Sequence, residues 1–248
     1  MSDQNDFVVP RLGGEPYVPR PPLAYMGGAL SLNLFSPPLT IHNAARLVVG
    51  VALALVLVAT AFASRELNGR AFRWVQVLIL VGSIGFWERA HVLSAELGLT
   101  AGLAIGLYGL ALALRRPVPG GIALGLGIAI GFLSRGYAVP LWLLATAAIL
   151  PLVSATWRTK AHLATLGIAI AIALPLSAAW PIALAQRSPD LHAAWTAAEN
   201  WREYFAPAAG SGFDPIYVVK NLPWFAWPAL PLAFWTLWIR GRGFNGGL

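Results

Sequence analysis

Residues 47–64 read LVVGVALALVLVATAFAS, an apolar run without a single charged side chain. A helix needs about 20 such residues to cross a bilayer. Similar runs follow one another to the end of the chain. They predict about seven membrane spans, at residues 43–64, 73–90, 97–114, 119–135, 138–155, 162–185 and 221–239. The sequence therefore predicts an all-α, polytopic membrane protein.

The composition of the whole chain agrees with this. Of its 248 residues, 58% are hydrophobic and 11% are charged, whereas a soluble domain carries about 25% charged residues. The absence of cysteine excludes disulfides and metal–thiolate sites. The net charge of +7 resides in short loops between apolar runs, which indicates membrane topology and no nucleic-acid partner.

Alternate loops differ in charge, which predicts an orientation. One set is short and almost purely basic, with Glu66 as its acid, and we expect it in the cytoplasm. The opposite set holds the other acids and would lie in the periplasm of a bacterial inner membrane. The chain then forms a single membrane domain over residues 1–248. It comprises a periplasmic juxtamembrane segment (1–42, with an interfacial helix at 23–35), membrane helices (43–185), a periplasmic loop (186–220) and the last membrane helix (221–239).

Ionisable residues gather on the predicted outer side. Arg20 lies between prolines, which stiffen the backbone, so it suits either a grip on a phosphate or a snorkelling role near lipid headgroups. Glu88, Arg89, His91 and Glu96 fall at a junction of spans, where ionisable groups mark function or pairing. Ser94 and Glu96 also fit a plain helix cap. His91 has no second metal ligand at a characteristic spacing, so the sequence leaves open whether the protein binds a metal.

Other features have a plain structural interpretation beside a functional one. Arg135 sits in a short gap and is either a hairpin corner or an anion ligand. Residues 198–205 suit an interfacial helix in which Glu199 pairs with Arg202. For Trp180, Trp195, Trp201, Trp224 and Trp227 we expect a membrane-interface belt. Gly120, Gly121, Gly125, Gly127 and Gly131 indicate close helix packing and no nucleotide loop.

The order of these motifs resembles the GT-C integral-membrane glycosyltransferases. Residues 9–25, VPRLGGEPYVPRPPLAY, are similar to the family segment P-x-L-x-G-x-P-Y…K-P-P-L-x-Y-W. Residues 44–47, 90–96, 131–136, 199–205 and 222–224 resemble later family motifs in the same order. The nearest branch comprises the aminoarabinose transferases of lipid A and the dolichyl-phosphate-mannose protein mannosyltransferase-like proteins.

The resemblance implies transfer of a sugar from a polyprenyl-phosphate donor to a lipid or protein acceptor on the outer face of the membrane. It implies a substrate-binding role for Arg20 and Arg135 at the lipid phosphate, with Tyr17, Arg89 and His91 nearby. It also implies a catalytic role for Glu96, with Glu88 beside it, and a divalent metal as an optional cofactor. A carboxylate would take the proton of the acceptor hydroxyl, while fixed cations stabilise the leaving phosphate.

The sequence departs from the family pattern in ways that leave two alternatives. The family's first membrane helix, which carries an Asp-Glu pair, and its C-terminal part have no counterpart here, and Pro19 replaces a family acid. One alternative is a catalytically incomplete fragment or accessory subunit that binds lipid phosphate. The other is a transporter or flippase of lipid-linked anions, which ranks last because the spans are nearly free of internal charge.

Overall fold

A computed structural model describes residues 8–12, 14–18, 20–36, 38–89, 94–198 and 215–241. Within these ranges the chain is helical apart from short turns and one small antiparallel ribbon. The elements are β1 (Arg11–Leu12), β2 (Glu15–Pro16), α1 (Leu23–Phe35), α2 (Ile41–Asn68), η2 (Arg70–Phe72), α3 (Val75–Val81), α4 (Ile84–Arg89), α5 (Ala95–Ala113), α6 (Pro117–Arg135), α7 (Ala138–Val153), η3 (Ala155–Trp157), α8 (Lys160–Arg187), α9 (Pro189–Ala198), α11 (Pro215–Phe225) and α12 (Ala229–Gly241).

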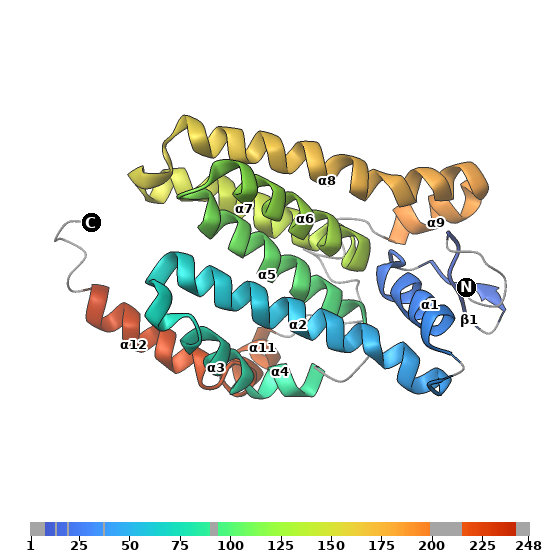
Figure 1. Ribbon diagram of the computed structural model, residues 1–248, viewed down its shortest axis with the longest axis horizontal. Coiled ribbons are helices and arrows are strands. Elements are labelled where there is room, and N and C mark those ends of the chain that lie inside the picture. The colour runs from blue at the N-terminus through green and yellow to red at the C-terminus, as the bar shows by residue number, and fades with distance from the viewer. Residues whose placement is uncertain are drawn as a thin grey trace.

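The long helices lie side by side along the long axis of the molecule (Figure 1). Helices α2, α5, α6 and α8 are long and apolar enough to span a membrane, which confirms the polytopic all-α prediction. Helix α1, the ribbon and α9 gather at one end, on the right of Figure 1. We call this the site end, and the opposite end, where α2 and α5 finish, the basic end.

Glycines bring the central helices α5 and α6 into close contact. A Cβ atom added at Gly127 would lie 2.6 Å from the Gly102 carbonyl oxygen and 2.7 Å from the Gly106 Cα atom. Gly121 and Gly125 of α6 meet α8 in the same way. This confirms the packing interpretation of these glycines, since small residues let membrane helices approach closely. Leu110, Leu124, Ile128, Val139, Leu143 and Ala169 form the apolar core around this contact.

The predicted span 73–90 is wrong as a single helix. The chain breaks at Gly82 and Ser83 into α3 and α4, of 7 and 6 residues. The Ser83 hydroxyl donates to the Ile79 carbonyl oxygen at 2.8 Å and the backbone turns there. Each piece is far shorter than the ~20 residues of a span. Hydropathy averaged over the run conceals this break.

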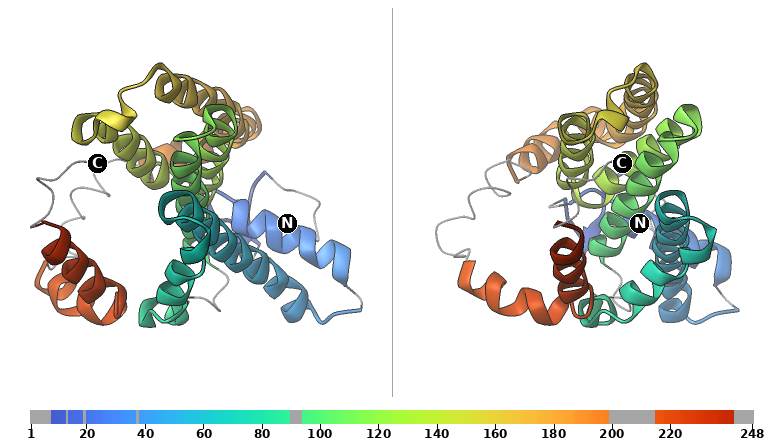
Figure 2. Two further views of the ribbon diagram at one scale, coloured as in Figure 1. Left: turned by 60° about the vertical axis from the view of Figure 1, so that its left-hand side comes forward. Right: turned by 90° about the vertical axis from the view of Figure 1, so that its left-hand side faces the viewer.

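The last predicted span, 221–239, is not straight either. Helices α11 and α12 meet at a bend of 95°. Pro228 lies at the bend, has no N–H to donate and restricts the backbone of Trp227 before it. In both views of Figure 2 this pair lies at the edge of the bundle, away from α8. Helix α7 occupies the predicted position, but its 16 residues fall short of the usual spanning length.

Candidate functional site

Arg20 enters the site end from the segment just before α1. Pro21 and Pro22, which follow it, are fully buried, and Pro22 holds the N-cap position of α1. Because proline fixes its own φ and restricts the residue before it, the backbone carrying Arg20 is stiff. The guanidinium Nη1 lies 3.5 Å from Oε1 of Glu96, 76 residues further along the chain.

Arg135 reaches the same carboxylate oxygen from another helix. It is the last residue of α6, and its Nε lies 3.5 Å from Oε1 of Glu96, which is in the first turn of α5. Gly136 then ends α6 with a φ of +72°, in the left-handed region that favours glycine. Arg135 therefore occupies the hairpin corner and also pairs with a carboxylate, while its role as a ligand of a bound anion stays a prediction.

The three side chains form a partly exposed ionic cluster, in which two arginines and one carboxylate leave one net positive charge. Their side-chain exposures are 38% for Arg20, 34% for Glu96 and 32% for Arg135. Ion pairs this exposed are worth about 0–1 kcal/mol each, because water screens them. A phosphate can therefore displace the carboxylate from the two guanidinium groups at low cost.

The alternative interpretation of Glu96, as part of a helix cap, is only partly met. Ser94 occupies the N-cap position of α5, but its hydroxyl makes no capping hydrogen bond and is buried without a partner among the described residues. The Glu96 carboxylate lies in the first turn of α5 and pairs with Arg20 and Arg135. Ser94 thus occupies the N-cap position of α5, but its side chain does not cap the helix.

Tyr17 and Tyr25 stand beside Arg20. Their rings meet edge to face, with centroids 6.3 Å apart. Partial burial raises the pKa of the Tyr25 hydroxyl, Tyr17 raises that pKa further, and the nearby Arg20 lowers it in part. The raised pKa favours the protonated Tyr25 hydroxyl, which can donate a hydrogen bond. The sequence interpretation included Tyr17 but missed Tyr25, although its place five residues after Arg20 in the family segment was a usable signal.

The N-terminal segment is held against the bundle by two tryptophans. The Trp180 indole Nε1 donates to the Val8 carbonyl oxygen at 2.8 Å. Trp180 and Trp195 are 6% and 2% exposed, and they pack with Val9 and Val18. The expected interface belt is therefore wrong for these two residues, which point into the protein.

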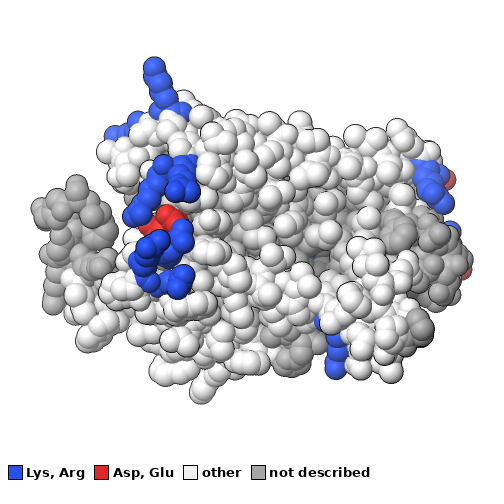
Figure 3. Space-filling view, in the orientation of Figure 1, with Lys and Arg blue, Asp and Glu red and all other residues white. Residues whose placement is uncertain are grey.

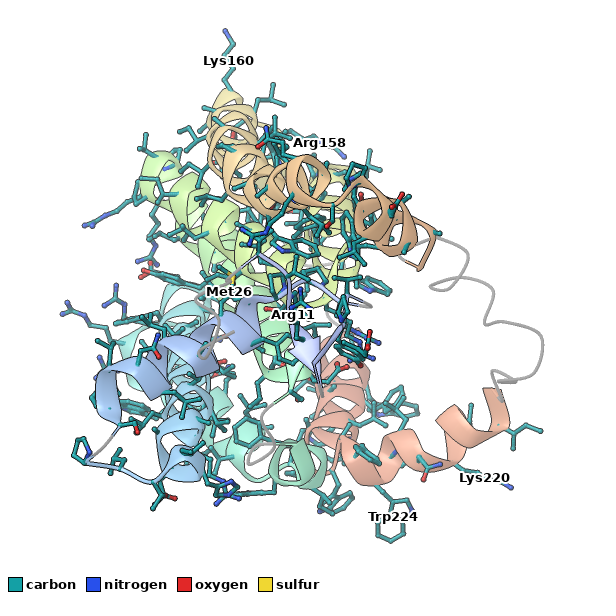
Figure 4. All side chains as sticks on the ribbon, turned by 90° about the vertical axis from the view of Figure 1, so that its right-hand side faces the viewer. Arg11, Met26, Arg158, Lys160, Lys220 and Trp224 are labelled. Atoms are coloured by element: carbon teal, nitrogen blue, oxygen red, sulfur yellow. The ribbon has the colours of Figure 1, made fainter. Side chains whose placement is uncertain are left out.

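The belt interpretation suits other tryptophans better. Trp224 and Trp227 are 70% and 55% exposed, and Trp224 points away from the molecule (Figure 4). Trp201 lies outside the described residues. Burial thus separates two uses of tryptophan that the sequence does not distinguish.

Two cavities lie at the helices that carry the ionic cluster. One, of about 550 Å³, is apolar and lies among α6, α7, α8 and α9; Phe132 and Tyr137, which are close to Arg135 along the chain, are on its wall. The other, of about 570 Å³, has Glu96, Thr100 and Ser83 on its wall. Glu96 therefore stands between the two arginines and a hollow with polar groups. Volumes in this range are typical of ligand pockets.

The remaining predicted site residues are not tested. Glu88 and Arg89 end helix α4, but the structure does not describe their side chains. His91, Glu199 and Arg202 lie outside the described residues. Among the described residues, no group of three His, Asp or Glu side chains is arranged to hold a metal ion.

This geometry can be compared with known proteins. The sequence matches no described family profile. It is 28% identical over 249 residues to the undecaprenyl phosphate-alpha-4-amino-4-deoxy-L-arabinose arabinosyl transferase of Serratia proteamaculans (strain 568), covering 91% of this chain and 42% of that protein. It is 30% identical over 275 residues to the enzyme of the same name from Edwardsiella ictaluri (strain 93-146), covering 100% of this chain and 45% of that protein.

A solved structure matches the fold. The crystal structure of ArnT from Cupriavidus metallidurans, bound to undecaprenyl phosphate, aligns with a TM-score of 0.73 and 20% identity over 98% of this chain and 44% of ArnT. The chain is thus similar in sequence to these arabinosyl transferases and in fold to ArnT. The resemblance to the aminoarabinose transferases seen in the motifs is thereby confirmed, and the chain spans less than half the length of the relatives it matches.

Proposed function

We propose that this chain binds a polyprenyl-phosphate-linked sugar and transfers the glycosyl group to a lipid or protein acceptor. The observation that carries the proposal is the convergence of Arg20 and Arg135 on one oxygen of Glu96. The two arginines come from the N-terminal segment and from the end of α6, so the fold assembles the cluster. The names of the arabinosyl transferases, and the ligand of the ArnT crystal structure, support the class of donor.

The proposed chemistry follows from the charges. In the transfer step the bond between the sugar C1 and the phosphate oxygen breaks, and the acceptor oxygen bonds to C1 from the opposite face. The leaving polyprenyl phosphate gains a negative charge, which Arg20 and Arg135 stabilise more strongly than they stabilise the donor. Their guanidinium forks suit phosphate oxygens.

The acceptor hydroxyl must lose its proton in the same step. Glu96 is the described carboxylate that pairs with both arginines and also lies on the wall of the second cavity, beside Thr100. Once phosphate occupies the arginines, the Glu96 carboxylate is released toward that cavity and serves as the proton acceptor. The predicted assistance of Glu88, Arg89 and His91, and of a divalent metal, stays a prediction.

The proposed location is the bacterial inner membrane, with the site end toward the periplasm and residues 1–42 forming a juxtamembrane segment of the single membrane domain. The support is the charge of the opposite end, where Arg65 lies in the last turn of α2 and short connections carry Arg70, Arg73, Arg115 and Arg116. Accessibility of an Arg11→Cys variant to a membrane-impermeant thiol reagent in intact cells tests the orientation, because the chain has no other cysteine. Labelling only after the membrane is permeabilised would place the site end in the cytoplasm and contradict the proposed orientation.

The test of function is transfer of a labelled sugar from a polyprenyl-phosphate donor in membranes that contain the full chain. Arg20→Ala and Glu96→Gln are each expected to lower the rate by about 100-fold or more, as for the loss of a group acting in the transition state. Arg11→Ala is the matched control, because Arg11 is exposed at the same end and its Nη1 bonds only locally, to the Gly14 carbonyl oxygen at 3.0 Å. Unchanged turnover in Arg20→Ala and Glu96→Gln would contradict the assignment.

A parallel binding measurement separates this proposal from the alternatives. Binding of polyprenyl phosphate without any transfer product would support the accessory subunit. Movement of a labelled lipid-linked sugar across proteoliposome membranes, again without product, would support the flippase.

A further inference from the structure

The basic end carries arginines that the proposed reaction does not use. Helices α2 and α5 lie side by side, and both finish at this end, so the connections that follow them are neighbours (Figure 1). Arg65 lies in the last turn of α2, and the connections that follow α2 and α5 carry Arg70, Arg73, Arg115 and Arg116. The described acid at this end is Glu66, which is 9% exposed.

Glu66 satisfies only one of these arginines. Its Oε1 accepts from Nη2 of Arg65 at 2.7 Å and from Nε of Arg65 at 3.1 Å. Among the residues that the structure describes, no ion pair joins Arg70, Arg73, Arg115 or Arg116 to an acid. The favourable interaction of cations with helix C-termini explains why arginines follow α2 and α5. It does not supply hydrogen-bond acceptors for four guanidinium groups.

Arg73 shows most clearly that an acceptor is missing. Its Nε is buried and has no hydrogen-bond partner within the described part of the chain. Its guanidinium lies over the Trp74 ring, 5.2 Å from the centroid, which holds the fork in place. A buried N–H without a partner costs about 1–3 kcal/mol, so a rearrangement of Arg73 that lets an anion accept from its guanidinium is favoured.

The surroundings identify the ligand as a lipid. Phe72 and Trp74 are 55% and 57% exposed beside the arginines, at the level where aromatic side chains meet lipid headgroups. Leu67, in the last turn of α2, and Leu78, on α3, expose 61% and 70% of their surface nearby along the chain. A phosphate bound at the arginines would thus have an apolar surface along which its acyl chains can lie.

The arrangement favours two phosphates over one. In the space-filling view the acidic atoms at this end, on the left, lie between two groups of basic atoms (Figure 3). The carboxylate repels an anion placed centrally, while the cations on either side attract one each. We propose that the basic end binds a phospholipid with two phosphates, one on each side of Glu66. Basic pockets between membrane helices are suited to such headgroups.

Native mass spectrometry of the purified full chain with cardiolipin, phosphatidylglycerol and phosphatidylcholine as probes tests this inference. We expect cardiolipin to bind about tenfold more tightly than phosphatidylglycerol. The Arg115→Gln/Arg116→Gln variant should lose about thirtyfold in cardiolipin affinity, because it removes two cations worth about 1 kcal/mol each near a lipid phosphate. Phosphatidylcholine reports binding that depends on the acyl chains alone.

The matched control is Arg158→Gln/Lys160→Gln, which removes the same charge from the same end. Arg158 is held by the carbonyl oxygens of Pro151 and Leu152, at 2.7 and 3.2 Å, and Lys160 points away from the molecule (Figure 4). Its cardiolipin affinity is expected to stay within about twofold of the parent, since surface charges away from a bound phosphate act weakly. Equal affinity of the parent for cardiolipin and phosphatidylglycerol, or equal losses in the two double variants, would overturn the proposal.

A second variant covers the case in which the glutamine variant does not fold. Arg115→Lys/Arg116→Lys keeps both charges but replaces the planar guanidinium forks by point charges. Its preference for cardiolipin over phosphatidylglycerol should fall by about threefold, because bidentate contacts are lost. An unchanged preference would show that the arginines do not hold the phosphates.

Discussion

Replacing Glu96 by glutamine should separate donor binding from transfer. In the resting site the carboxylate competes with phosphate for Arg20 and Arg135, through two contacts of 3.5 Å. The side chains are about one-third exposed, so each contact is worth about 0.2–1 kcal/mol. Releasing both contributes about 0.4–2 kcal/mol, which is a gain of about twofold to thirtyfold in affinity for polyprenyl phosphate.

The assay is a titration of the purified chain with a fluorescent polyprenyl phosphate, with sugar transfer measured in parallel. Glu96→Gln should bind the lipid more tightly and transfer sugar far more slowly, while Arg20→Ala should fail in both. Glu15→Gln is the control, because Glu15 is exposed on the ribbon at the same end. It should change neither quantity.

The double variant Arg135→Gln/Glu96→Gln tests the physical reasoning further. If Glu96 competes with phosphate through Arg135, the gain from Glu96→Gln should shrink when Arg135 is already removed, which is a coupling that a mutant cycle measures. Weaker binding in Glu96→Gln, to the extent seen for Arg20→Ala, would refute the competition and place the carboxylate among the groups that hold the donor.

Three further outcomes are expected. Gly127→Ala should lower the free energy of unfolding by about 1–3 kcal/mol or more, because the added methyl group meets the α5 backbone. The control Gly50→Ala meets nothing within 4 Å and should be neutral or stabilising in the same thermal unfolding assay. Equal effects of the two variants would contradict the packing. Trp180→Phe removes the hydrogen bond to the N-terminal segment, worth about 1 kcal/mol, and should speed hydrogen exchange over residues 8–18, while Trp224→Phe should leave it unchanged. The pKa of Tyr25 is raised from 10.0, so the neutral form of its hydroxyl is favoured in the folded state. The stability that this provides is present below pH 10 and is lost as the pH rises through the pKa of the folded protein. Tyr25→Phe should remove this loss when unfolding is measured at alkaline pH.

The sequence determined the elements whose signal is local. Apolar runs placed α2, α5, α6 and α8 within a few residues, and the glycines of α6 indicated their close packing. Length and hydropathy suffice there, because a membrane helix satisfies its own backbone hydrogen bonds. The same local signal misled at residues 73–90, where an apolar run conceals a break at Gly82, and at Trp180 and Trp195, because hydropathy does not tell a lipid-facing side chain from one that faces protein.

What the sequence did not determine was contact between distant residues. Arg20, Glu96 and Arg135 each stood out as a charge at the edge of an apolar run, and each kept a plain structural interpretation beside the functional one. The tertiary structure brought them together: glycines pack α5 against α6, which places the first turn of one beside the last turn of the other, and buried prolines and tryptophans dock the N-terminal segment there. Charge and hydropathy can be read from the sequence. An ionic site depends on distances of a few ångströms between side chains of different helices, and the packing of the helices sets those distances.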